Sequence, residues 1–260
     1  MRESLLQIQD EVPFNNFTGL LRGAGIGFPS ELGGDCVVQA RQLVDKLREK
    51  GMRASYLEAV DKKHIAVVAS RGEELFYLDP LLYQDEPSSL TAAFKKGVAS
   101  VVRARPMVNS LPSKVTVAGM SSQAFDVSAA SLWRDVGFYS SFWGSRFSLG
   151  KKLDELPAVY REPTAVPPST FLLRVLNGKG EVLEIRRAAY AKERFSVGRM
   201  EGIRYAETSA EELSDNHEAE AIVLEIARLI GVEASVILDK MAEATRVCMK
   251  RQAMRTEGVR

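Results

Sequence analysis

The sequence predicts an α+β fold in which a cysteine-bearing helix packs on an antiparallel sheet, followed by a β-rich middle region and C-terminal helices. An apolar stripe of helical period follows Gly33 and Gly34, three β-like runs separated by short turns come next, and the last fifty or so residues again show helical spacing. We therefore expect a core domain at 1–110, a β-rich region at 111–206 and a helical region at 207–260.

The composition is that of a globular chain. Of its 260 residues, 45% are hydrophobic and 27% are charged, so extensive disorder is not expected. The net charge of +1 attracts neither nucleic acid nor an anionic membrane, and no run reaches the ~18 apolar residues of a membrane span. Two distant cysteines without a signal peptide favour a reducing compartment. We expect a cytoplasmic protein without nucleic-acid or membrane partners; the oligomeric state stays open.

The stretch "ELGGDCVVQA" (31–40) introduces the first helix. Its apolar positions fall on one helical face: Cys36, Ala40, Leu43, Val44 and Leu47. Asp35 is a candidate N-cap and Gly51 a candidate C-terminal stop, so we expect a helix over about 36–50. Cys36 then lies in the first turn, where unpaired N–H groups and the helix dipole favour a thiolate. The same stripe is also typical of a packed core cysteine.

Three predicted strands follow, at 52–60, 64–70 and 74–79. His64 opens the second strand and Asp79 ends the third, before Pro80. If Arg71-Gly72 forms a two-residue turn, His64 and Asp79 stand directly opposite each other, with Cβ atoms about 4.5 to 5.5 Å apart. A turn of three or five residues would place them on opposite faces of the sheet.

These three residues together have the types that thiol catalysis needs. A catalytic cysteine requires a base within hydrogen-bonding reach and a third group that orients the base. Cys36, His64 and Asp79 are the candidates, and the backbone at Gly34 and Cys36 is the candidate oxyanion site. Taken alone, His64 would be a structural hydrogen-bonding residue and Asp79 an ordinary turn residue.

The middle region contains a predicted strand at 113–119 and a hairpin at 171–187 built around Asn177-Gly178. Between them, aromatic side chains recur at a spacing of four, from Phe138 to Phe147. Phe138, Phe142 and Trp143 are candidates to line a substrate pocket, with simple core packing as the alternative.

The C-terminal region is predicted to be helical. Ser209 and Glu212 form a capping-box pattern for a helix that Gly231 ends, and a second helix places Cys248 in the core. His217 is expected at the surface. No cysteine or histidine has another within five residues, so we expect no metal ion. No glycine-rich phosphate loop of Walker or Rossmann type appears, and we expect no tightly bound cofactor.

Three stretches carry a family resemblance: "LGGDCVVQA", "KKHIAVVAS" and "LFYLDPLL". Over about residues 30–82 they resemble the Cys-His-Asp core of arylamine N-acetyltransferases, which transglutaminase-like and papain-like thiol enzymes share. The resemblance implies that Cys36 accepts the acyl group, that His64 is the general base and acid, and that Asp79 orients His64. Leu32 stands where those acetyltransferases have an arginine, and "DPLLYQ" replaces their Val-Gly-Phe-Gly type run.

The resemblance further implies an acyltransferase that forms a Cys36 thioester and passes the acyl group to an amine or a carbon nucleophile. The implied co-substrate is an acyl-CoA or an acyl-carrier thioester, so the partner is a small molecule or a carrier-protein-bound acyl group. An amide synthase or a Dieckmann-type cyclase of natural-product biosynthesis fits this chemistry. Two alternatives stay open: a transglutaminase-like cysteine amidase or protease, and an inactive binding module of the same fold.

Overall fold

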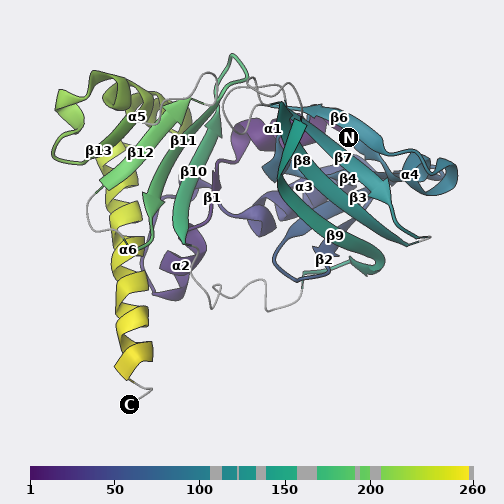
Figure 1. Ribbon diagram of the computed structural model, residues 1–260, viewed down its shortest axis with the longest axis horizontal. Coiled ribbons are helices and arrows are strands. Elements are labelled where there is room, and N and C mark those ends of the chain that lie inside the picture. Colours follow the sequence, from purple (N-terminus) through teal and green to yellow (C-terminus); the bar gives the residue numbers. More distant parts are fainter. Residues whose placement is uncertain are drawn as a thin grey trace. The chain divides into compact units, whose positions relative to one another are not determined.

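The computed structural model describes residues 1–105, 113–121, 123–132, 139–156, 169–190, 194–199 and 206–257 (Figure 1). The chain forms two compact units, each with its own sheet and apolar core. The first unit comprises residues 1–11, 36–157 and 200–202; the second comprises 12–35, 158–199 and 203–260. The chain therefore passes between the units several times.

The first unit packs helices on an antiparallel sheet. Its helices are α1 (Arg2–Glu11), α3 (Cys36–Glu49) and α4 (Leu90–Lys96), with a 3₁₀ turn at Pro80–Leu82. Its strands are β2 (Arg53–Ala59), β3 (Ile65–Arg71), β4 (Glu74–Leu78), β5 (Ser88–Ser89), β6 (Ser100–Ala104), β7 (Ser113–Gly119), β8 (Ala124–Leu132) and β9 (Tyr139–Leu153). Among the described residues the strand order is β5-β4-β3-β2-β9-β8-β7-β6.

This first sheet closes on itself. Edge strand β6 returns to the segment between β4 and β5 through a bridge between Gln84 and Ala104, and the Asp85 N–H donates to the Arg103 carbonyl at 2.9 Å. Helix α3 packs on β2 and β3, and α1 packs on α3. The enclosed core contains three aromatic rings that pack against one another, those of Tyr77, Phe125 and Phe147.

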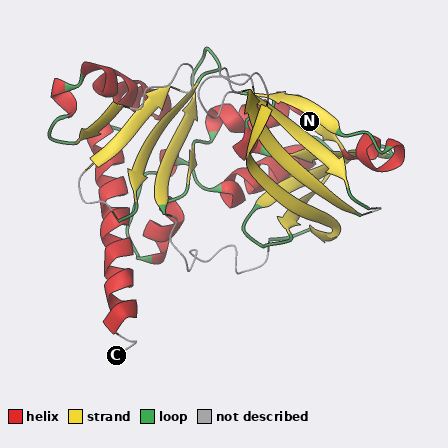
Figure 2. Cartoon of the chain, viewed as in Figure 1, coloured by secondary structure: helices red, strands yellow, loops and turns green. Residues whose placement is uncertain are grey.

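The second unit has a smaller antiparallel sheet beside two long helices (Figure 2). Its strands are β1 (Phe14–Asn15), β10 (Thr170–Leu176), β11 (Val182–Ala188), β12 (Arg194–Arg199) and β13 (Ala206–Ser209), paired in the order β1-β10-β11-β12-β13 in the described chain. Its helices are α2 (Thr18–Gly23), α5 (His217–Ile230) and α6 (Ala234–Glu257), with 3₁₀ turns at Ser30–Leu32 and Leu213–Asp215. Helix α5 packs on β10, β11 and β12.

Most of the predicted local elements are present. The helix predicted at 36–50 is α3, and the three strands predicted after it are β2, β3 and β4. The strand predicted at 113–119 is β7, and the hairpin predicted at Asn177-Gly178 joins β10 to β11. Gly231 ends α5 in a left-handed conformation. Cys248 is buried in the core of the second unit, as expected, while the His217 side chain is 92% exposed.

The aromatic run, whose secondary structure the sequence left open, belongs to strand β9 from Tyr139 to Leu153. One local prediction is wrong, that of the helix start after Ser209. The hydroxyl of Ser209 does accept the Glu212 N–H at 3.2 Å, but the residues after it form a 3₁₀ turn. Helix α5 begins later, at His217, where the Asn216 side chain caps it by accepting the Ala219 N–H at 3.1 Å.

The sheet of the first unit runs across the predicted domain boundary at residue 110. Strands β6 and β7 lie on either side of that position and pair from Ser100↔Val117 to Ala104↔Ser113. The two compact units therefore divide the chain differently from the expected regions 1–110, 111–206 and 207–260.

Candidate functional site

Cys36 is the first residue of α3 and is partly exposed. The helix forms here because its apolar side chains share one face, which packs on β2 and β3. The buried residues of this helix are Gln39, Ala40, Leu43, Val44 and Leu47. Cys36 stands at the N-terminal end of that face, so the stripe packs without fully burying it.

The chain before Cys36 is fixed by a close approach of two backbone segments. Gly33 has φ of 74°, and a Cβ atom there would lie 2.1 Å from the Pro13 carbonyl oxygen. The Gly34 N–H donates to the same oxygen at 3.1 Å, and the Asn15 N–H donates to the Gly34 carbonyl at 2.8 Å. Since the Gly34 N–H already has a partner, an oxyanion role for it is not supported. The Cys36 N–H keeps that role as a proposal.

His64 and Asp79 meet in the interior of the first unit. Nε2 of His64 lies 2.7 Å from Oδ2 of Asp79, and the two residues are 6% and 0% exposed. The predicted register is wrong by two residues, because the hairpin turn is at residues 72–73 and Arg71 pairs with Glu74. A shift of two residues keeps the side chains on the same face, so Asp79 reaches His64 along a diagonal.

The carboxylate of Asp79 is hydrogen-bonded at both oxygens. Oδ2 accepts from His64 and also from the hydroxyl of Tyr77, at 2.8 Å, while Oδ1 accepts the Leu81 N–H at 3.1 Å. Burial and the neighbouring Asp79 carboxylate raise the pKa of Tyr77 well above its ordinary value, so the phenol stays protonated and donates. These donors compensate for the removal of the carboxylate from water.

The electrostatics favour a charged His64. Burial lowers the pKa of His64, but the carboxylate of Asp79 and the sulfur of Cys36, through their charges and hydrogen bonds, outweigh that effect. The pKa of His64 therefore lies well above the ordinary histidine value. Because Nε2 is held by Asp79, Nδ1 is the ring nitrogen left for Cys36.

Aromatic rings enclose His64 on the side of β9. The ring centroid of Trp143 lies 5.3 Å from that of His64 and the centroid of Phe147 lies 6.1 Å away, both edge to face. Strand β9 has a bulge just before Trp143: Trp143 pairs with Ala129, whereas Ser141 pairs with Ala130. A bulge changes the direction in which the following side chain points, and here that side chain is Trp143.

The three candidate pocket residues have different outcomes. Trp143 lies against His64. Phe142 belongs to strand β9, but its side chain is outside the described part of the structure, and Phe138 is outside the described residues altogether. Tyr77 was missed by sequence reasoning, because a tyrosine inside a strand is most simply a core residue. Its position two residues before Asp79, on the same strand face, is the signal that indicates it.

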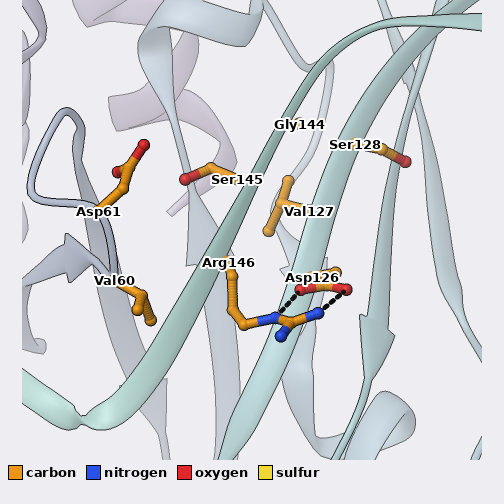
Figure 3. A pocket seen from close by; sticks show the side chains of 8 residues that line it. All are labelled: Val60, Asp61, Asp126, Val127, Ser128, Gly144, Ser145 and Arg146. Carbon is orange, nitrogen blue, oxygen red and sulfur yellow. Dashed lines mark hydrogen bonds and ion pairs between the residues drawn. The ribbon is translucent and has the colours of Figure 1, made fainter.

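A groove of about 600 Å³ lies next to the turn that carries His64. Figure 3 shows Arg146 paired with Asp126 within it, through contacts of 2.7 and 3.1 Å. Its lining residues are Val60, Asp61, Asp126, Val127, Ser128, Gly144, Ser145 and Arg146. Since neighbouring side chains of a strand point to opposite faces, Arg146 faces away from the side on which Phe147 contacts His64. The ion pair of Arg146 and Asp126 in this groove therefore lies on the opposite face of the sheet from His64.

Within the described residues, no group of three or more histidine, cysteine, aspartate or glutamate side chains could hold a metal ion. The helices of the described chain include none that is both long and apolar enough to cross a bilayer.

The chain packs helices on antiparallel sheets and brings His64 and Asp79 together in one of them, and solved structures share this fold. The chain is similar to the arylamine N-acetyltransferase of Mycobacterium marinum in complex with CoA, with a TM-score of 0.52 and 12% identity over 94% of this chain and 92% of that one. It is also similar to the arylamine N-acetyltransferase of Mycobacterium abscessus, with a TM-score of 0.58 and 11% identity over 93% and 87%. These likenesses confirm the predicted α+β, acetyltransferase-like fold. No protein-family model and no curated protein sequence matches the chain.

Proposed function

We propose that this protein is a cysteine-dependent acyltransferase in which Cys36, His64 and Asp79 act as the catalytic triad. The observation that carries the proposal is the buried contact of 2.7 Å between His64 and Asp79, with the Cys36 sulfur near enough to His64 to raise its pKa. Cys36 stands at the N-terminus of a helix, in a fold that resembles acyl-transferring enzymes. A cysteine packed in the core, or a histidine–aspartate pair with a purely structural role, would not need this arrangement, whereas thiol catalysis does.

The first half-reaction loads the acyl group onto Cys36. His64 takes the thiol proton, and the thiolate attacks the carbonyl carbon of a thioester donor. A carbon–sulfur bond to Cys36 forms while the donor's carbon–sulfur bond breaks, and His64 returns the proton to the leaving thiolate. The backbone N–H of Cys36 stabilises the oxyanion of the tetrahedral intermediate.

The second half-reaction passes the acyl group on. An amine or a carbon nucleophile attacks the Cys36 thioester and gives its proton to His64, and the Cys36 thiol is restored. Trp143, whose ring lies against His64, lines the acceptor side. The half-buried indole keeps water from the His64 imidazole, which favours transfer over hydrolysis.

For the donor we propose a CoA or carrier-protein thioester, and for the acceptor a small molecule of a biosynthetic pathway, as in an amide synthase or a Dieckmann-type cyclase. The neighbour from M. marinum was solved with CoA, which supports the first of these donors. Both cysteines are free, which supports a reducing compartment such as the cytoplasm.

Intact-mass analysis tests this function. The protein is incubated with acetyl-CoA, longer acyl-CoAs and acyl-carrier thioesters, beside the variants Cys36→Ala and Cys248→Ala. We expect the mass of one acyl group to be added to the wild type and to Cys248→Ala, and none to Cys36→Ala. An added mass that persists in Cys36→Ala would overturn the assignment. Release of the acyl group to water alone, from an amide donor, would favour the amidase alternative.

A further inference from the structure

Gln84 lies buried beside the triad, and its carboxamide bonds only main-chain groups. It is 0% exposed. Its Oε1 accepts the Asp79 N–H at 3.2 Å, and its Nε2 donates to the carbonyls of Tyr77 at 3.3 Å and Glu86 at 2.8 Å. This one side chain therefore joins the backbone before, at and after the turn that carries Asp79.

The sheet itself does not hold Asp79. The last β4 residue in the ladder with β3 is Leu78, which pairs with Val67. The next residue after Asp79 is a proline, which has no N–H and cannot extend the ladder. The Asp79 N–H is bonded by Gln84 instead, so the side chain of Gln84 takes the place of a neighbouring strand.

Gln84 is itself anchored from two sides. The Gln9 side chain, on α1, donates to the Gln84 carbonyl at 3.0 Å. On the other side, the backbone at Tyr83 and Asp85 bonds the end of β6: the Arg105 N–H donates to the Tyr83 carbonyl, and the Asp85 N–H donates to the Arg103 carbonyl, both at 2.9 Å. The position of Gln84 is thus set by α1 and by the closing strand of the sheet.

A strained residue directs Gln84 back toward Asp79. Tyr83 ends the 3₁₀ turn with φ of 48° and ψ of 36°, a left-handed conformation that costs free energy in any residue other than glycine. Tyr83 is 1% exposed. Such conformations persist where the surrounding structure enforces them, and they concentrate at functional sites.

We propose that Gln84 is a positioning residue of the triad: it holds the main chain of Asp79 so that Oδ2 meets Nε2 of His64. This inference rests on the proposed function. Gln84 touches neither Cys36 nor a reacting atom, and it acts only through Asp79. Its removal lets Asp79 move within the turn, which weakens the contact with His64 and thereby the thiolate of Cys36.

The test compares Gln84→Met with Asp79→Asn and with the double variant in the full chain. Methionine has a similar length but makes no strong hydrogen bonds. The readouts are the pH dependence of Cys36 alkylation by iodoacetamide and of its acylation by p-nitrophenyl acetate. We expect Gln84→Met to slow both reactions at pH 6 by about tenfold or more, since small displacements in a catalytic site have large effects on rate. In the Asp79→Asn background the same change should alter the rate by less than about twofold, because the two residues act as a unit.

A matched control separates positioning from general destabilisation. Asn177 is another buried amide, 5% exposed, that holds a loop by accepting the N–H groups of Lys179 and Glu181 at 3.0 and 2.9 Å. Asn177→Ala should lower the melting temperature and leave the pH profile of Cys36 unchanged. If Gln84→Met does not fold, Gln84→Asn takes its place, since it keeps the amide but is one methylene shorter.

The outcomes are distinguishable. Suppose that Asp79→Asn slows the alkylation and acylation of Cys36, while Gln84→Met leaves both rates and the pH profile at the wild-type values. The inference about Gln84 is then overturned and the proposed function stands. If Asp79→Asn itself leaves the rates of Cys36 alkylation and acylation unchanged, the proposed function fails, and the inference fails with it.

Discussion

The phenol of Tyr77 and the imidazole of His64 donate to the same oxygen of Asp79. The ring of Tyr77 also packs against Phe125 and Phe147, with centroids 6.0 and 5.4 Å away. Replacement by phenylalanine removes the hydroxyl and keeps the ring. The contribution of the phenol to Asp79 can therefore be measured apart from packing.

For Tyr77→Phe we expect a loss of about 1 to 2 kcal/mol in the free energy of unfolding, because a buried hydrogen bond to a charged group is removed. Urea unfolding measures the change. As a control, Tyr190→Phe alters a tyrosine that is 47% exposed and should leave stability within about 0.5 kcal/mol of the wild type. A Tyr77→Phe protein as stable as the wild type would contradict the hydrogen bond to Asp79.

The raised pKa of His64 makes stability depend on pH in a defined direction. The folded state binds the His64 proton more tightly than the unfolded state, whose histidine has an ordinary pKa of about 6.5. The stabilisation is therefore fully present below about pH 6.5 and is lost as the pH rises through the folded-state pKa.

Replacing His64 by glutamine should remove this pH dependence. We expect the urea midpoint of the wild type to fall as the pH is raised from 6 toward 9, and the midpoint of His64→Gln to fall less over the same range. His217→Gln is the control, since that side chain is 92% exposed. Equal slopes in wild type and His64→Gln would refute the coupling of His64 to Asp79 and Cys36.

At the scale of an element, the segment that leads into α3 depends on one glycine. Gly33→Ala would place a Cβ atom 2.1 Å from a backbone oxygen of Pro13, in addition to the strain of its positive φ. We expect it to destabilise the protein by about 3 kcal/mol or more.

Gly51→Ala is the matched control at the other end of the helix. Its φ of 73° is nearly the same, but its Cβ would have no atom within 4 Å. We expect a loss of only about 1 to 2 kcal/mol, from the left-handed backbone alone. Denaturant unfolding of both variants compares them, and equal losses would show that the contact with Pro13 does not matter.

The elements also show which sequence patterns are sufficient to predict secondary structure and which are not sufficient to predict strand register. The stripe of α3 and the strands around His64 and Asp79 were predictable because local periodicity matches burial. The register was not, since Arg71-Gly72 is a weak turn signal and Gly72-Glu73 forms the turn instead. For β9, a spacing of four places residues on the same face of a helix and of a strand, so the aromatic pattern could not separate the two.

Gln84 was missed for a related reason. A glutamine in the polar run "YQDEP" is typical of an exposed loop. Its burial follows from α1 and from the end of β6, which are far from it in sequence, and no local pattern contains that information. The three triad residues could be predicted, unlike Gln84, because a cysteine, a histidine and an aspartate are residue types that thiol catalysis requires.

At the scale of the whole molecule, the two cysteines differ in exposure. Cys36 is partly exposed, whereas Cys248 is 0% exposed in the core of the second unit, and burial raises the pKa of its thiol. We expect iodoacetamide to modify one cysteine in the native protein and both after unfolding in denaturant. Mass spectrometry gives the stoichiometry, and Cys36→Ala should remain unmodified when native. Labelling of Cys248 in the folded protein would contradict the described core.

The division of the molecule was the least predictable feature. Strand β2 pairs with β9, which joins Tyr56 to Leu153, and β1 pairs with β10, which joins Phe14 to Arg174. Pairings over such separations bring distant segments into one sheet. Each unit is therefore built from several separate segments, which a division of the sequence into contiguous regions cannot describe.

The two-residue turn between β3 and β4 also determines which sequence separations place two side chains on the same face of the sheet. Arg71 pairs with Glu74, so residues that face the same side across this hairpin have numbers of opposite parity. His64 and Asp79 are fifteen residues apart, an odd separation, and meet although they are not directly paired. In a chain with the same two-residue turn, separations of thirteen or seventeen would keep the two side chains on the same face of the sheet, whereas fourteen or sixteen would not. A search for unrecognised members of this architecture can therefore use odd spacing, rather than a fixed motif, as its criterion.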